Sequence, residues 1–337
     1  MISILEKQYG TRNETRSETR SETRSDTRSE IANECLIPWY VIGVIAIICA
    51  ATLVLIAFLG PIGQEIIQYR TSQSGVWQIA GQDLTNLVLI APILLIGGIL
   101  CLARRAGSKY LLILTPITLM YTGLSMGIGQ EWSNSAYNGN IEDYWWLFGI
   151  LIVGGLILLL GSLSMFTEAD APDFKLRGLR IYVGFMTVFF LLFAVMWISQ
   201  IQQVTNTGDL PDGSYKAAPT AFWTIRYLDL GISIPLGFLA LFLMLSKPKK
   251  AYSILLLFFG FFITIGTSVD MMAIVQVLNG DMEAAKEGLF IFPVLTFLSY
   301  GGLFYLVKDK LRQGVFKSSE IQLKDQITGK DYSRKKK

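Results

Sequence analysis

The sequence predicts an all-α integral membrane protein whose eight transmembrane helices form two tandem four-helix repeats of the same orientation. Hydrophobic residues make up 52% of the chain and charged residues 16%, against about 25% charged residues in soluble domains. The charges gather in both tails and in short loops, and the apolar stretches between them reach the roughly 20 residues that cross a bilayer. Several motifs also recur between the halves of the chain, which predicts the repeats.

Eight apolar stretches define the predicted spans. The first begins near Leu36, after a long charged tail, and it is too long for the apolar region of a signal peptide. The seventh is the longest, and we expect it to tilt in the bilayer. The predicted spans are 36–60, 83–103, 109–129, 144–166, 179–200, 222–245, 251–278 and 287–307. Aromatic residues lie near their ends, as an interfacial belt requires; they include Trp39, Trp77, Trp132, Trp146, Trp197 and Trp223.

The distribution of lysine and arginine predicts that both termini are cytoplasmic. Basic residues concentrate in the two tails and in the loops 104–109, 175–180 and 247–250. The loops on the other side contain few: Arg70, Lys216 and Lys286, with Arg226 near the outer end of span six. Cytoplasmic loops carry the excess of lysine and arginine in membrane proteins. We therefore expect a multi-pass protein of the cell membrane with both tails inside.

Recurring motifs predict an internal duplication. Trp77, followed by Asp83 and Leu84, recurs as Trp223, followed by Asp229 and Leu230, at an offset of 146. Three further pairs recur at similar offsets: Arg104-Arg105 with Lys249-Lys250, Gly154-Gly155 with Gly301-Gly302, and Pro92 with Pro235. Because each repeat holds an even number of spans, the two must insert with the same orientation, related by an axis along the membrane normal.

These features divide the chain into five parts. Residues 1–35 contain repeated TRSE tetrapeptides that place like charges four residues apart, a spacing that repels on a helix, so we expect a disordered cytoplasmic tail. Residues 36–166 form the first membrane repeat, 167–178 a cytoplasmic linker, and 179–307 the second repeat. Residues 308–337 form a basic cytoplasmic tail, which we expect to contact anionic lipid headgroups beside the bilayer.

A pattern within spans two and six resembles that of a group of uncharacterised prokaryotic multi-spanning membrane proteins. It consists of a QDL or DL motif followed by a proline inside the span, and a basic turn follows the first of them. The residues that carry it are Gln82, Asp83, Leu84, Pro92, Asp229, Leu230 and Pro235. The resemblance covers about residues 36–307. It implies the fold but no chemistry, since the group has no established activity.

Polar residues inside or beside the spans define a candidate polar site: Asp83, Gln130, Arg226, Asp229 and Asp270. Counted from the basic turns at about 1.5 Å per residue, they reach similar depths near the outer ends of spans two, three, six and seven. Arg226 and Asp229 are three residues apart and can share a helix face. We expect Arg226 to pair with Asp229 or Asp270, because an unpaired charge facing lipid is costly. The alternative is a purely structural cluster of ion pairs and snorkelling side chains.

The chain lacks the residues and motifs of common membrane enzymes. It has no histidine, which excludes histidine-ligated haem and most catalytic zinc sites. Cys35, Cys49 and Cys101 form no CxxC pair, and no P-loop, GxSxG or HExxH motif occurs. The sequence therefore indicates no cofactor and no metal site. The basic C-terminal tail is explained by the positive-inside rule, so we expect no nucleic-acid partner.

Three classes of function are consistent with a polytopic membrane protein of this kind: a transporter or channel, an accessory subunit and an enzyme. The repeats and the buried charges favour a transporter or channel with an outward-facing polar site between helices 2, 3, 6 and 7. The absence of a repeated charged pair at the membrane centre favours a non-catalytic sensor, assembly or accessory subunit. Missing histidine and nucleophile motifs disfavour an enzyme of lipid-linked substrates. A cavity joining Asp83 and Asp229 would favour transport, and a solid centre packed with leucine and phenylalanine would favour the accessory function.

Overall fold

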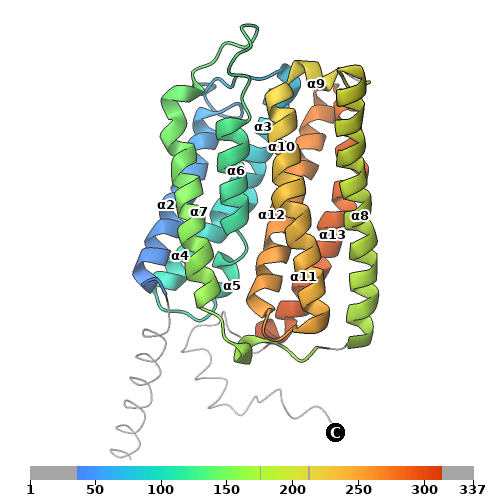
Figure 1. The fold of residues 1–337 in the computed structure, drawn as a ribbon. Helices are drawn as coiled ribbons and strands as arrows, with labels where there is room; N and C mark the ends of the chain where they lie inside the picture. The colour runs from blue at the N-terminus through green and yellow to red at the C-terminus, as the bar shows by residue number, and fades with distance from the viewer. Residues whose placement is uncertain (1–35, 175, 212, 313–337) are drawn as a thin grey trace, which may run out of the picture.

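The computed structural model describes residues 36–174, 176–211 and 213–312 as a bundle of upright helices (Figure 1). No residue in these ranges forms a strand. The predictions for the N-terminal tail and for most of the C-terminal tail concern residues 1–35 and 313–337, which lie outside the described residues. Among the described residues, eight continuous helical stretches are long and apolar enough to cross a membrane, which indicates a multi-pass membrane protein and confirms the predicted number of spans.

Sixteen helical segments make up the described chain. The first half contains α2 (Trp39–Leu59), α3 (Gln73–Thr85), η1 (Asn86–Ile90), α4 (Ala91–Leu102), α5 (Ser108–Leu112), α6 (Pro116–Ile128), η2 (Ile141–Tyr144), α7 (Trp145–Ser164) and η3 (Glu168–Asp170). The second half contains α8 (Leu176–Thr207), α9 (Ser214–Ala217), α10 (Pro219–Leu228), η4 (Asp229–Ser233), α11 (Ile234–Ser246), α12 (Tyr252–Leu278) and α13 (Met282–Arg312). Consecutive segments join into the eight spans, so that α3, η1 and α4 form one of them.

Two features of the spans differ from the prediction. The second span begins at Gln73 rather than at 83, because the Ser72 side chain caps the helix by accepting a hydrogen bond from the Gly75 amide at 3.2 Å. The seventh span, α12, has 27 residues and is shorter than α8 with 32 and α13 with 31. It is instead the most buried of the eight spans, so its strongly apolar sequence reflects a central position in the bundle.

Spans two and six are interrupted at matching places. Each contains a five-residue π-helix, η1 or η4, and the α-helix that follows has a proline at its start, Pro92 in α4 and Pro235 in α11. Proline lacks the amide proton and its ring clashes with the carbonyl of the preceding turn. A wider π turn accommodates that ring without breaking the span, and π turns are frequent at functional sites. Both interruptions lie beside the aspartates of the candidate site.

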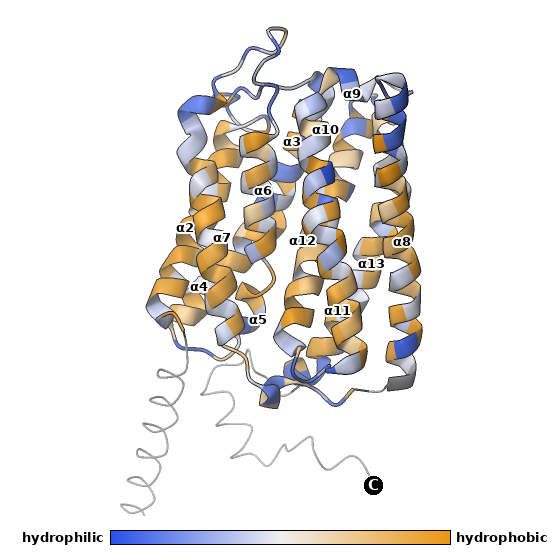
Figure 2. Cartoon of the chain, in the orientation of Figure 1, coloured by the Kyte–Doolittle hydropathy of each residue, from blue (hydrophilic) through white to orange (hydrophobic). Residues whose placement is uncertain are grey.

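Figure 1 shows that successive helices run up and down, with the first half of the chain on the left and most of the second half on the right. We call one end of the bundle the basic end; its turns carry Arg104, Arg105, Lys249 and Lys250. The opposite end, the acidic end, carries the loops 60–72, 129–140, 208–218 and 279–281. Figure 2 shows an apolar band across the middle of the bundle and hydrophilic residues at both ends.

The centre of the bundle is packed with aromatic side chains. Phe258, Phe259, Phe261 and Phe262 of α12 are all fully buried, and successive rings contact one another with centroids 4.8–5.1 Å apart. Offset and edge-to-face contacts of this kind add stability beyond the burial of apolar area. Gly260 lets α12 approach the start of the third span, since a Cβ there would lie 2.3 Å from the Leu114 Cα.

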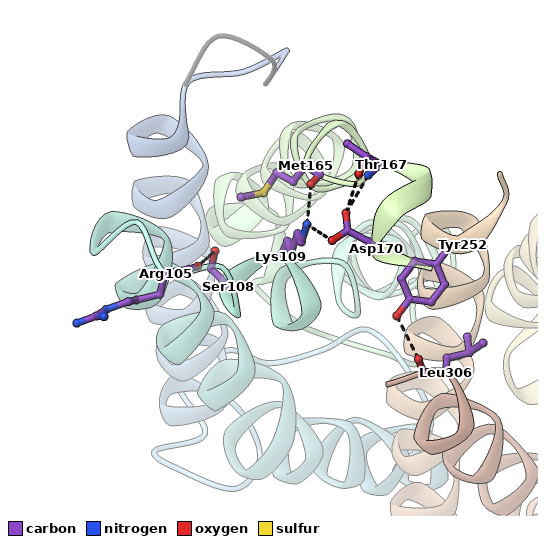
Figure 3. Close-up of polar contacts among 8 residues, drawn as sticks. All are labelled: Arg105, Ser108, Lys109, Met165, Thr167, Asp170, Tyr252 and Leu306. Atoms are coloured by element: carbon purple, nitrogen blue, oxygen red, sulfur yellow. Dashed lines mark hydrogen bonds and ion pairs between the residues drawn. The ribbon is translucent and has the colours of Figure 1, made fainter. Parts of the chain in front are cut away.

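An ion pair ties the loops of the basic end together (Figure 3). The Lys109 ammonium donates to Asp170 Oδ1 at 2.7 Å and to the Met165 carbonyl at 3.2 Å. Asp170 also accepts a hydrogen bond from the Thr167 amide at 2.9 Å. Both charged side chains are largely buried, with 17% exposure each. The pair therefore fixes the loop after α7 against the start of the third span.

Candidate functional site

Asp83 of α3 is fully buried, and neither of its carboxylate oxygens has a hydrogen-bond partner. It lies in the polar first half of the second span, just before η1. The end of α2 approaches it closely, since a Cβ on Gly60 would lie 2.8 Å from Asp83 Oδ2. A buried carboxylate without a partner is rare in proteins, because the desolvation of its charge is uncompensated.

Two further buried polar groups without a partner lie beside Asp83. Asn86, one helical turn further on, accepts a hydrogen bond from Gln82 Nε2 at 3.0 Å, but its own Nδ2 has no partner. The hydroxyl of Tyr69, in the loop between α2 and α3, has none either. Burial, and secondarily the charge of Asp83, raises the pKa of Tyr69 well above its ordinary value, so this phenol keeps its proton. Tyr69 was missed by the sequence analysis, because nothing in a polar loop indicates a buried tyrosine.

Asp229 of η4 differs from Asp83 because both of its carboxylate oxygens are hydrogen-bonded. It is also buried, but its carboxylate accepts three hydrogen bonds. Tyr121 Oη and Ser233 Oγ donate to Oδ1 at 3.1 and 2.9 Å, and Trp197 Nε1 donates to Oδ2 at 3.0 Å. Hydrogen bonds to the charged form stabilise a buried carboxylate. Asp229 is therefore held in place by α6 and α8, whereas Asp83 is not held.

Trp197 does not belong to the interfacial belt, contrary to the prediction. The ring is 6% exposed and links the two charged residues of the sixth span. Its Nε1 donates to Asp229, and its face lies 4.2 Å from the guanidinium of Arg226. A buried indole requires an acceptor for its N–H, and here Asp229 supplies it.

Arg226 is held by stacking and by an amide. Its guanidinium lies between the rings of Trp197 and Phe222, 3.9 Å from the latter, and donates to Gln200 Oε1. Among the described residues no ion pair joins Arg226 to Asp229 or Asp270. The shared contact with Trp197 nevertheless brings Arg226 and Asp229 to one place, as their spacing in the sequence predicted. A guanidinium sandwiched between aromatic faces is stabilised by cation–π attraction.

Gln130 holds a loop within the first half of the chain, and its neighbour Glu131 ties the first half to the second at the acidic end. Gln130 Oε1 accepts from the Arg70 amide at 2.8 Å, and its Nε2 donates to the Met126 carbonyl at 2.8 Å. Glu131 is 3% exposed and caps the start of α10. It accepts from the amides of Thr220 and Ala221 at 2.9 and 3.2 Å and from the Thr220 hydroxyl at 3.0 Å. Both side chains thus have structural partners, and Gln130 is not hydrogen-bonded to Asp83.

Asp270 of α12 lies half-buried, and its Oδ1 has no hydrogen-bond partner. Its helix runs antiparallel to α3: the Thr85 hydroxyl reaches the Thr267 carbonyl at 3.5 Å, and Gln276 Nε2 donates to Ser74 Oγ at 2.9 Å. These contacts bring α12 against the helix that carries Gln82 and Asp83, and the Asp270 side chain makes neither of them. Of the five predicted residues, Asp83 lies in one polar cluster and Arg226 and Asp229 lie in another, while the hydrogen bonds of Gln130 go to neither.

In the middle of the bundle, α6 and α12 contact each other directly. Thr118 of α6 and Thr264 of α12 are hydrogen-bonded to each other through their hydroxyls. No group of three or more acidic or cysteine side chains among the described residues is arranged to hold a metal ion. The chemistry available at the Asp83 cluster is therefore that of a carboxyl group, a phenol and two amides, which can bind and release a proton or hold a small cation.

Comparison with known proteins gives no further indication of function. No protein-family model, no curated protein and no solved structure matches this chain. The resemblance to uncharacterised prokaryotic membrane proteins stays an expectation.

Proposed function

We propose that this protein is a proton-coupled membrane carrier in which Asp83 takes up and releases the coupling proton. The observation that carries the proposal is the fully buried carboxylate of Asp83, neither of whose oxygens has a partner. Ionisable residues inside membrane spans commonly mark proton relays and ion pathways. A proton neutralises the carboxylate, which removes the cost of keeping an uncompensated charge out of water.

The difference between the two aspartates supports a division of roles. Asp229 accepts hydrogen bonds from Tyr121, Trp197 and Ser233 and so anchors the sixth span to α6 and α8. Asp83 lies just before the π-helix of the second span, beside Asn86, whose Nδ2 has no partner. In this proposal, movement of the π turn or of the loop that carries Tyr69 exposes Asp83 to the acidic end. The solute that moves with the proton would bind between helices 2, 3, 6 and 7.

We also propose that the chain consists of two tandem repeats related by a twofold axis. Thr118 and Thr264 are 146 residues apart in the chain and contact each other. Leu114 and Gly260, which have the same offset, also contact each other. Equivalent residues meet in this way where a twofold axis passes between them. These contacts support an axis that runs between α6 and α12.

Contacts on either side of that axis also support a twofold relation between the two repeats. Gln276 donates to Ser74 at the start of α3, and Glu131, which follows Gln130, accepts from Thr220 at the start of α10. Ser74 and Thr220 differ by the same offset as Gln130 and Gln276. Repeats of this type carry binding sites at their interface in many transporters.

We further propose that the basic end is cytoplasmic, with both termini inside a cell membrane. Lysine and arginine accumulate in cytoplasmic loops, and Arg104, Arg105, Lys249 and Lys250 all lie at the basic end. The clusters around Asp83 and Asp229 then lie toward the outer surface. Protons would reach Asp83 from the outside.

A second candidate is a non-catalytic sensor, assembly or accessory subunit. The observation that favours it is the solid centre of the bundle, where Phe258, Phe259, Phe261 and Phe262 of α12 are fully buried. A carrier must open a path through this centre, whereas an accessory subunit needs only a stable scaffold. The two functions differ in whether Asp83 exchanges its proton during the activity of the folded protein.

The thermal stability of the purified protein as a function of pH tests the role of Asp83. Protonation removes the uncompensated charge, so we expect the melting temperature of the wild type to fall as pH rises relative to that of Asp83→Asn, whose side chain stays neutral. Asp143→Asn, which alters an exposed acid at the same end, is the matched control and should follow the wild type. Parallel pH profiles for the wild type and Asp83→Asn would contradict the proposal.

A further inference from the structure

An apolar groove of about 560 Å³ lies between α8 and α13 in the half of the bundle next to the basic end. Its sides are formed by Ile181 and Tyr182 of α8 and by Gly301 and Tyr305 of α13. Phe259 of α12 lies at its base. Its volume falls within the range of about 300–1,000 Å³ that small-molecule sites occupy. The polar clusters of Asp83 and Asp229 contribute no side chain to it.

The glycine pair of α13 explains why this groove exists. A Cβ on Gly302 would lie 2.2 Å from the Phe259 ring, so this glycine brings α13 onto α12. A Cβ on Gly301 would meet no atom within 4 Å, so the helix face toward α8 stays open. The Tyr182 hydroxyl donates to the Leu298 carbonyl at 3.1 Å and joins the two helices one turn beyond Gly301. The groove therefore opens toward the basic end.

The first half of the chain has no such opening at the corresponding place. There, a Cβ on Gly154 would lie 2.3 Å from Cys49 Sγ, so α7 packs directly against α2. Under the proposed repeats, Gly154 corresponds to Gly301. The helices are therefore in direct contact at Gly154 and apart at Gly301. The existence of the groove does not depend on the repeats.

Positive charge lies beside the groove at the basic end. Arg180 is exposed between the lining residues Leu179 and Ile181. The Lys308 ammonium lies 4.4 Å from the centre of the Tyr305 ring, which lines the groove. Asp309 is the one acid beside these groups on α13, and Lys310 and Arg312 follow it. The Tyr252 hydroxyl fixes the backbone of this wall by donating to the Leu306 carbonyl at 3.2 Å (Figure 3).

We infer that the groove binds one acyl chain of an anionic phospholipid whose headgroup contacts Arg180 and Lys308. The apolar walls match a hydrocarbon chain, and basic groups at the membrane surface attract anionic headgroups. Lysine and arginine side chains extend along apolar surface to reach such headgroups. Figure 2 shows hydrophobic segments along α8 and α13, with hydrophilic residues toward the basic end of α8.

The test measures lipid-specific stabilisation of the full chain in detergent. Phosphatidylglycerol should raise the melting temperature of the wild type more than phosphatidylcholine does, since a ligand bound only to the folded state stabilises it. Gly301→Leu places a side chain in the groove from a position where a Cβ meets no atom within 4 Å, and it should abolish this difference. Gly184→Leu is the matched control: a Cβ there also meets no atom within 4 Å, it lies one turn further along α8 and is not one of the lining residues, and it should keep the difference.

A second variant separates the headgroup from the acyl chain. Arg180→Gln combined with Lys308→Gln should lower the stabilisation by phosphatidylglycerol to the level reached with phosphatidylcholine. Equal stabilisation by both lipids in the wild type would overturn the inference, as would a Gly301→Leu variant that retains the difference. A wild type that forms dimers dispersed by Gly301→Leu would overturn it too, because a second copy would then occupy the groove. None of these results depends on Asp83.

Discussion

Replacement of Glu131 by alanine should destabilise the protein strongly, although this residue lies in a polar loop. Its carboxylate accepts from the Thr220 and Ala221 amides and from the Thr220 hydroxyl. Glu131 is 3% exposed, so water has little access to the two amides once the carboxylate is removed. A carboxylate at the start of a helix also interacts favourably with the helix dipole. The removal leaves the first amides of α10 without an acceptor.

The expected loss follows from these contacts. One hydrogen bond to a charged group contributes about 1.5–3 kcal/mol, and the two amides share one capping carboxylate, so we expect a loss of roughly 2–4 kcal/mol in the free energy of unfolding. At about 2 °C per kcal/mol for a large chain, the melting temperature should fall by roughly 4–8 °C. Glu131→Gln keeps an oxygen for the amides and should lose much less.

Thermal unfolding in detergent, followed by tryptophan fluorescence, measures this effect. Asp143→Ala is the control, because it removes an exposed acid from the same end of the bundle and should leave the melting temperature nearly unchanged. If Glu131→Ala melts within about 1 °C of the control, which is less than 1 kcal/mol, the cap contributes nothing and the account of the contact between the halves of the chain is wrong.

Two further predictions concern the sixth span and the orientation. Arg226→Ala should lower stability by about 1–2 kcal/mol through the loss of cation–π contacts, and its combination with Asp229→Asn should cost less than the sum of the single changes, because both side chains contact Trp197; thermal unfolding of the four proteins that shows strict additivity would contradict the coupling. In a background without the native cysteines, Asn138→Cys should react with an impermeant thiol reagent added outside cells and Ala106→Cys should not; the reverse pattern would contradict the proposed orientation.

Composition was enough to predict the membrane-spanning class and the number of spans, because the bilayer requires long apolar helices whatever their partners. It could not locate the ends of helices that begin in polar sequence. The second span starts at Gln73, before the apolar stretch, because Ser72 caps it and α12 packs along it. The two π-helices were also missed, since a proline inside a span, such as Pro92 or Pro235, gives no indication of a wider turn.

The sequence was enough to select the acidic residues of the candidate site, but not the side chains that surround them. Asp83 and Asp229 were selected as acids inside spans, and both are buried. The aromatic and amide groups that decide their environments come from distant parts of the chain; Tyr121, for example, lies 108 residues from Asp229. Glu131 was not selected as a candidate, because its contact with Thr220 spans 89 residues. Tertiary contacts of this kind leave no local signal in the sequence.

The most direct test of the proposed function is proton movement in the membrane. Protein reconstituted into liposomes on a solid-supported sensor would be exposed to a rapid change in outside pH, and the transient charge displacement recorded. The account predicts a displacement in the wild type and in Asp143→Asn, and its loss in Asp83→Asn, with all three proteins folded and equally incorporated. An unchanged displacement in Asp83→Asn, or none in the wild type, would contradict the assignment of Asp83 as the proton-binding group.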